Sequence, residues 1–163
     1  MDVKNFIVRP DGFGIPRGAA KVHGITTELA EKEGISLDIV LEEFNKVLQD
    51  VTVIVGHNIE FDLNILGAEY LRRDLSTTLF DLHSVDTKDE ATDYCALPGG
   101  KGGNYKWPTL DEMHAKLFGE GFDAAHNASA DVQATARCFL ELIRIGVIGA
   151  ETLTCKQKVN NRD

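Results

Sequence analysis

Cysteine is scarce in this chain, and long apolar runs are absent. The three cysteines, Cys95, Cys138 and Cys155, show no Cys-x-x-Cys spacing, and their odd number argues against a disulfide framework. No apolar run approaches the roughly 18 residues that a membrane span requires. Asp2 and Lys4 stand where a signal peptide would have a basic stretch and an apolar core, so we expect none. These features predict a protein of the reducing cytoplasm with no membrane partner.

Positive charge is also in short supply. The sequence has 17 lysines and arginines against 26 aspartates and glutamates, a formal net charge of -9. A protein that binds duplex DNA through a broad phosphate-neutralising surface usually carries the opposite sign, which disfavours a repressor or an architectural DNA binder. The acidic balance does not exclude an enzyme that meets phosphate through divalent cations, because the carboxylates that hold such ions add negative charge.

The apolar segments predict an α/β fold. Val51–Val55 has no polar alternation beyond one threonine, which predicts a strand covered on both faces. A second strand is expected within Thr78–Val85, and a third at Val3–Val8, before the turn-forming sequence Pro-Asp-Gly. Helical patterns lie between these strands, so we predict a layered α/β fold in a single domain over residues 1–163.

Six segments carry helix signals. Ser36 is placed to cap the clearest helix, and Thr109 and Glu112 have the spacing of a capping box. Apolar residues recur every three or four positions in most of these segments, which predicts one buried face for each helix. The predicted helices are Thr27–Lys32, Leu37–Leu48, Ile59–Tyr70, the polar segment Asp86–Asp93, Thr109–Phe118 and Ala128–Ile145.

Two segments place ionisable side chains where chemistry is plausible. Asp62 follows a buried strand by one turn, and ligands gather at the carboxyl ends of parallel strands. The alternative, favoured on this segment alone, is that Asp62 only complements the dipole of its helix. His126 and Asp131 can converge if the histidine precedes a helix and the aspartate lies in its opening turns. That arrangement suits a general base beside a metal ligand, but a surface histidine and a helix-start aspartate are the commoner outcome.

The glycine-rich segment Pro98–Asn104 does not match a phosphate-binding loop. It lacks the GxxxxGK[ST] pattern and does not lead from a buried strand into a helix, so we predict a mobile loop. Lys101 lies within this segment and Lys106 and Trp107 follow it, and two interpretations of these three residues stay open. They could contact a nucleic acid, or Trp107 could pack against the helix that begins after Pro108.

Three motifs taken in order carry a family resemblance. They read VHGIT at residues 22–26, GHNIEFDLNIL at 56–66 and HNASADVQAT at 126–135. The chain thereby resembles the DnaQ-like 3′–5′ exonucleases, in the histidine-containing DEDD group that includes the proofreading epsilon subunit of bacterial DNA polymerase III. The resemblance extends from Phe6 to about Leu142. It implies an RNase H-like three-layer fold with a mixed sheet.

The resemblance also implies roles for individual residues. Asp62 and Asp131 match metal-binding aspartates, and His126 matches the histidine that deprotonates the attacking water. The implied reaction is hydrolysis of the terminal phosphodiester of DNA with two Mg²⁺ or Mn²⁺ ions. The implied partners are the 3′ end of single-stranded DNA and a DNA polymerase. The residues expected near the terminal nucleotide are His23, Gly24, Ile25, Thr26, Asn58 and Phe61.

One part of the family pattern is missing. The family begins with a strand that bears Asp-x-Glu, whereas this sequence offers only Asp2-Val3-Lys4. We therefore expect an exonuclease domain truncated at its N-terminus, lacking its first two strands and part of its metal site. Strand edges left open in this way favour self-association. The alternative is a non-catalytic module that uses the same fold to bind nucleic acid or a polymerase.

Overall fold

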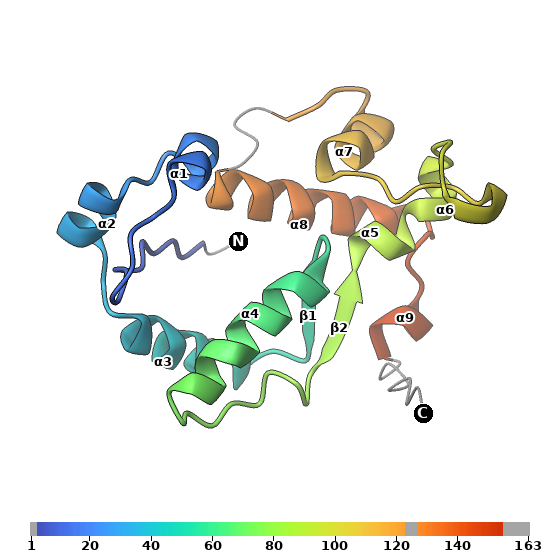
Figure 1. Ribbon diagram of the computed structural model, residues 1–163. Helices are drawn as coiled ribbons and strands as arrows, with labels where there is room; N and C mark the ends of the chain where they lie inside the picture. The colour runs from blue at the N-terminus through green and yellow to red at the C-terminus, as the bar shows by residue number, and fades with distance from the viewer. Residues whose placement is uncertain (1–2, 123–126, 155–163) are drawn as a thin grey trace.

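The structure, a computed structural model, describes residues 3–122 and 127–154 (Figure 1). None of the helices in those residues combines the length and hydrophobicity needed to cross a bilayer. The strands are β1 (Val53–Gly56) and β2 (His83–Asp86). The helices are α1 (Arg17–His23), α2 (Thr27–Glu33), α3 (Leu37–Leu48), α4 (Ile59–Arg72), α5 (Thr87–Glu90), α6 (Thr92–Cys95), α7 (Leu110–Phe118), α8 (Ala128–Arg144) and α9 (Ala150–Thr154), with a 3₁₀ turn, η1, at Lys101–Gly103.

β1 and β2 pair in parallel, as an α/β fold requires. Val53 lies opposite His83, and Gly56 lies opposite Asp86. A parallel pair needs a long crossover connection, which α4 supplies. Both strands therefore end at the same edge of the sheet, where Gly56 leads into α4 and Asp86 leads into α5. The two predicted strands in this part of the chain are confirmed, with shorter bounds.

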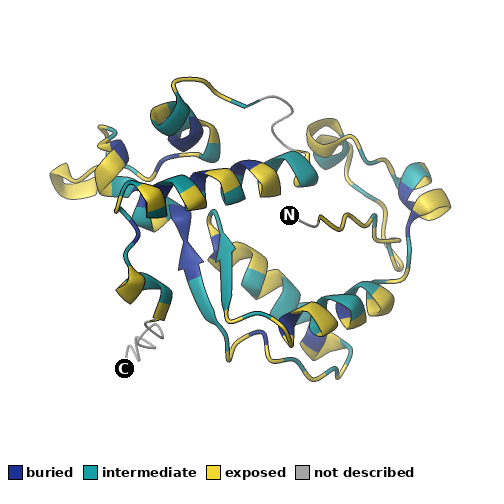
Figure 2. Ribbon diagram, turned by 180° about the vertical axis from the view of Figure 1, so that it is seen from behind, coloured by how far each residue is buried: buried dark blue, intermediate teal, exposed yellow. Residues whose placement is uncertain are grey.

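β1 lies between two hydrophobic cores. Val53 and Val55 pack against a core of β2, α7 and α8 that includes Met113 and Leu142. Ile54 faces the other way, against a core formed by α3, α4 and the segment before β2. This alternation follows from the two-residue period of a strand. The expectation that both faces are covered is confirmed, although the four residues of β1 are only half-buried. Figure 2 shows the buried residues on β2, α7 and α8.

The predicted strand at Val3–Val8 is wrong. Val8 makes a single parallel bridge with Ile35, and the side chains of Val3 and Phe6 are exposed. Apolar, β-branched residues favour a strand, but a strand forms only where a neighbour offers hydrogen bonds along its length. Within the described residues this segment finds that neighbour at one position only.

Two short helices were not predicted. α1 begins after Pro16 without a side-chain cap and buries none of its residues, so it lacks the apolar stripe by which a helix is recognised. α9 spans only five residues. The predicted polar helix at Asp86–Asp93 is confirmed in substance, because α5 and α6 occupy most of it. The glycine-rich loop is compact and is closed by a hydrogen bond from the Lys106 amide to the Leu97 carbonyl, 2.9 Å long.

Tyr70 provides a test of the contact between α3 and α4. Its side chain is 2% exposed, and its hydroxyl donates a 2.8 Å hydrogen bond to the Leu41 carbonyl. Tyr70→Phe should lower the free energy of unfolding by about 1 kcal/mol, the usual net worth of one such bond. Urea denaturation measures this change. Tyr94→Phe, at a tyrosine whose ring lies at the surface, should leave stability unchanged, and equal effects of the two variants would contradict the packing described here.

Candidate active site

The candidate site is built on the turn that joins β1 to α4. Gly56 ends the strand, and a Cβ atom there would lie 2.8 Å from the side chain of Ile59, so the turn requires glycine. Asn58 has a left-handed backbone with φ of 65° and makes no side-chain cap. Asparagine tolerates that conformation better than most residues. The first amides of α4 must therefore find an acceptor elsewhere.

Asp86, the last residue of β2, supplies that acceptor. Its carboxylate accepts hydrogen bonds from the amides of Asn58 (2.9 Å) and Ile59 (3.1 Å). It also accepts one from the Lys88 amide at 2.9 Å, which starts α5. Asp86 is only 7% exposed, so these bonds replace the water that a carboxylate would otherwise bind. One buried side chain thus caps two helices and joins the ends of both strands.

Asp62 lies in the first turn of α4, close to this buried carboxylate. Partial burial raises the pKa of Asp62 above its ordinary value, and the negative charge of Asp86 raises it further, against the opposing effect of a backbone hydrogen bond. Phe61 precedes it with its ring exposed. The structure therefore brings Asn58, Phe61 and Asp62 together at the carboxyl edge of the sheet, where the sequence predicted them.

The same edge carries further acidic side chains. Burial raises the pKa of Asp89 and of Glu90, and in both cases the neighbouring carboxylates, including Asp86, add to the effect. The ammonium of Lys88 lies 3.7 Å from carboxylate oxygens of Asp86 and Asp89. Burial is the larger cause, and the smaller contribution of the neighbouring carboxylates is one that a bound cation would relieve.

A second network ties this turn to the segment before α7. The Thr87 hydroxyl lies 2.9 Å from the Gly56 carbonyl and 3.1 Å from Nδ1 of His57, while Nε2 of His57 lies 3.0 Å from the Pro108 carbonyl. A carbonyl only accepts, so Nε2 carries a hydrogen. Burial lowers the pKa of His57. The single hydrogen of the Thr87 hydroxyl is donated to the Gly56 carbonyl. His57 therefore connects the β1–α4 turn to the segment before α7 through polar contacts of its ring.

The third motif is described only in part. Asn127 caps α8 by accepting hydrogen bonds from the amides of Ser129 and Ala130, which places Asp131 in the first turn, as predicted. His126, the predicted general base, lies outside the described residues. Among the residues that are described, no three histidine, cysteine, aspartate or glutamate side chains gather as a group that could hold a metal ion. Asp62 and Asp131 have the oxygen chemistry that Mg²⁺ prefers but do not complete such a site on their own.

The segment His23–Thr26 joins α1 to α2. His23 ends α1, and its Nδ1 accepts a hydrogen bond from the Ile25 amide. Gly24 has a left-handed backbone, and Thr26 caps α2 through the Leu29 amide. Figure 1 shows α1 and α2 away from the sheet. The structure does not bring these four residues to Asp62.

Comparison with known proteins identifies the family of the chain. The sequence profile of the exonuclease family, of the RNase T type, matches residues 2–139. The chain belongs to the exonuclease family. The resemblance to DnaQ-like exonucleases is thereby confirmed. DNA polymerase III of the PolC type from three strains of Streptococcus pneumoniae (D39, R6 and TIGR4) is 31% identical over 145 residues, which cover 86% of this chain. The chain spans 9% of the length of these relatives.

Sequence analysis of this exonuclease-family chain missed Asp86. Its only signal was an aspartate at the end of a predicted strand, and we assigned it to the start of a polar helix. The assignment to a helix start is correct, because Asp86 accepts a hydrogen bond from the Lys88 amide at the start of α5. The larger role, capping α4 across the sheet, depends on the pairing of β1 with β2 and has no signature in the local sequence.

Replacement of Asp86 should lower the free energy of unfolding. In Asp86→Asn the charge is lost, and one of the two acceptor oxygens becomes an amide group that opposes the backbone N–H of α4. We expect the free energy of unfolding to fall by about 2–3 kcal/mol, as for buried hydrogen bonds to charged groups. Asp89→Asn, three positions after the cap and at an exposed side chain, should change it by less than about 0.5 kcal/mol. Equal urea midpoints for the two variants would contradict the capping role.

Replacement of Asp62 should have the opposite effect on stability from replacement of Asp86. Its pKa is raised in the folded state, so its ionised form costs stability as the pH rises through the folded pKa. Asp62→Asn should therefore raise the Tm slightly at pH 7, and the gain should vanish below about pH 3.8, the ordinary aspartate value, where both states are protonated. Thermal melts across this pH range measure the difference. A lower Tm for Asp62→Asn than for the unsubstituted chain at pH 7 would contradict this expectation.

Proposed function

We propose that this chain is a 3′–5′ exonuclease domain that hydrolyses terminal phosphodiesters of DNA. The observation that carries the proposal is the exonuclease-family match over residues 2–139, which includes all three motifs. The similarity to DNA polymerase III of the PolC type supports DNA as the substrate and a polymerase as a partner. The position of Asp62 at the carboxyl edge of β1 and β2 is consistent with an active site there.

The proposed fold is RNase H-like, with helices on both faces of a mixed sheet. β1 and β2 form the described part of that sheet, and the two cores on either side of β1 account for the layers. In this arrangement the motif residues act from helix starts. Asp62 acts from the first turn of α4 and Asp131 from the first turn of α8.

Divalent ions, Mg²⁺ or Mn²⁺, supply positive charge to the phosphate and activate water in two-metal hydrolysis. Asp62 and Asp131 would hold them, and His126 would accept the proton of the attacking water. Asn58 and Phe61 would contact the terminal nucleotide. The 163 residues contain no Asp-x-Glu pair, and both oxygens of Asp86 are engaged by amides. The chain therefore lacks the two carboxylates that an Asp-x-Glu strand contributes in the family pattern.

This shortage supports a second candidate function. A chain that keeps the fold and the exposed Phe61 but holds metal poorly would act as a non-catalytic module that binds nucleic acid or a polymerase. The two candidates differ in one measurable property, the release of nucleotides from a 3′ end.

Nucleotide release from a 3′-labelled single strand, with Mg²⁺ or Mn²⁺ and with or without a chelator, tests the proposal. We expect the 163-residue chain to release little, because Asp62 and Asp131 alone hold two ions poorly. A version extended at its N-terminus by an Asp-x-Glu strand should show release that the chelator stops. In that version His126→Ala should reduce the rate by about 10²–10⁴-fold, the usual contribution of a general base.

The controls separate the outcomes of this assay. Asp81→Asn, at an exposed aspartate before β2, should leave the rate of the extended version unchanged. Chelator-sensitive release by the 163-residue chain itself would show that other carboxylates complete the site. An extended version that binds the strand without releasing nucleotides would favour the non-catalytic module.

A further inference from the structure

Trp107 combines an exposed ring with a firmly held backbone. It is the one tryptophan of the sequence, and it is 64% exposed. The residue before it, Lys106, donates its amide hydrogen to the Leu97 carbonyl, and the carbonyl of the residue after it, Pro108, accepts from His57. A large apolar ring at the surface is unfavourable in water, so an ordered segment that presents one is typical of a binding surface.

The ring adjoins the candidate active site through Lys88. The ammonium of Lys88 lies 4.4 Å from the centroid of the indole ring. The same ammonium donates a 3.0 Å hydrogen bond to Oδ1 of Asn58. Lys88 is largely buried, which strengthens its attraction to the ring. A single side chain therefore spans from Trp107 to the turn that carries Phe61 and Asp62.

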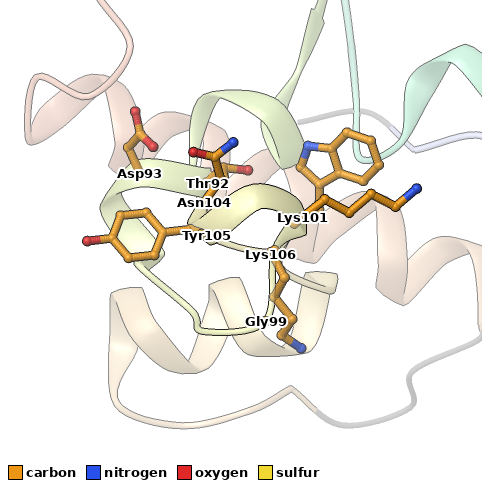
Figure 3. A pocket seen from close by; sticks show the side chains of 10 residues that line it. Thr92, Asp93, Gly99, Lys101, Asn104, Tyr105 and Lys106 are labelled. Atoms are coloured by element: carbon orange, nitrogen blue, oxygen red, sulfur yellow. The ribbon is translucent and has the colours of Figure 1, made fainter.

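A pocket of about 810 Å³ lies beside Trp107. It is formed by the compact glycine-rich loop and the start of α6, and its lining includes Lys101 and Tyr105. Figure 3 shows Lys101, Asn104 and Tyr105 projecting from the loop. The ammonium of Lys106 forms a 2.6 Å ion pair with Glu112, which neutralises its charge. The pocket thus offers exposed aromatic rings and the ammonium of Lys101 beside exposed backbone.

We propose that Trp107 and this pocket form a second binding subsite, which holds a base of a single-stranded nucleic acid. The inference rests on the proposed function, in which Asn58 and Phe61 would contact the terminal nucleotide. The subsite would hold the nucleotide next to it. Indole stacks on any nucleobase, and Lys101 is free to approach the adjoining phosphate. A duplex does not fit this chemistry, because its bases are already stacked and the net charge of -9 opposes a broad phosphate contact.

Tryptophan fluorescence tests the subsite directly, since all indole emission comes from residue 107. The 163-residue chain is titrated with an eight-nucleotide thymidine strand in the presence of a chelator, which prevents cleavage. Stacking predicts saturable quenching. A strand of the same length with abasic sites should quench much less, and a uridine strand should quench as the thymidine strand does, because both present a base. Equal quenching by the abasic strand would overturn base stacking.

Anisotropy of a labelled strand measures the contribution of the ring to affinity. Trp107→Ala should weaken binding by about 5- to 150-fold, the range for loss of one stacked base, and Trp107→Phe should restore most of it. The matched control is Phe80→Ala, because Phe80 is also 64% exposed but lies before β2, at the other end of the strand from Asp86. Equal loss in Trp107→Ala and Phe80→Ala would overturn the proposal.

The outcomes distinguish this inference from the proposed function. A strand that binds without changing the emission of Trp107 overturns the subsite, whereas 3′ nucleotide release by the extended version still supports the exonuclease. Quenching and loss of affinity in Trp107→Ala support the subsite even if the extended version releases nothing. Absence of any binding by anisotropy overturns the subsite whatever the nuclease assay gives.

Discussion

The buried carboxylate of Asp86 is the interaction on which the rest of this structure depends. It ends β2, yet its strongest contacts are with the amides that begin α4 and α5. A helix start leaves several N–H groups without partners, and here no side chain within the turn caps α4. Because the cap comes from the neighbouring strand, the pairing of β1 with β2 and the placement of α4 are coupled. Asp62 is positioned by that coupling.

The acidic side chains at the edge of the sheet are ionised at a cost in stability. Asp62, Asp89 and Glu90 all have raised pKa values, which means that their ionised forms are unfavourable in the folded chain. A protein selected for stability alone would replace such residues. The proposed function gives these carboxylates a use, because a cation bound at this edge would favour their ionised forms.

The loops around this edge are held together by His57 and Lys88, two side chains that are neither at the surface nor in either core. His57 connects the β1–α4 turn to the segment before α7, and Lys88 connects Asn58 to Trp107. Both act through polar contacts that need the other elements already in place. The contacts on either side of Trp107 explain how its ring is presented on a firmly held backbone.

The sequence by itself determined the elements whose signals are local. The apolar stripe of Leu37–Leu48, the capping box at Thr109 and the apolar run at Val51–Val55 each correspond to an element of the structure, because periodicity and caps act within a few residues. The three motifs determined the family. Asp131 was placed at a helix start correctly for the same reason, since Asn127 caps the helix from the adjacent position.

Only the tertiary structure decided the rest. Val3–Val8 has the composition of a strand but lacks a partner along its length, and strand pairing is a long-range property. The role of Asp86 depended on which amides the sheet register brings to it. Trp107 could pack or remain exposed, and the choice came from His57 and Lys88, which lie 50 and 19 residues away in the sequence. Local patterns specify elements, whereas a buried charge and the contacts between loops depend on residues that only folding brings together.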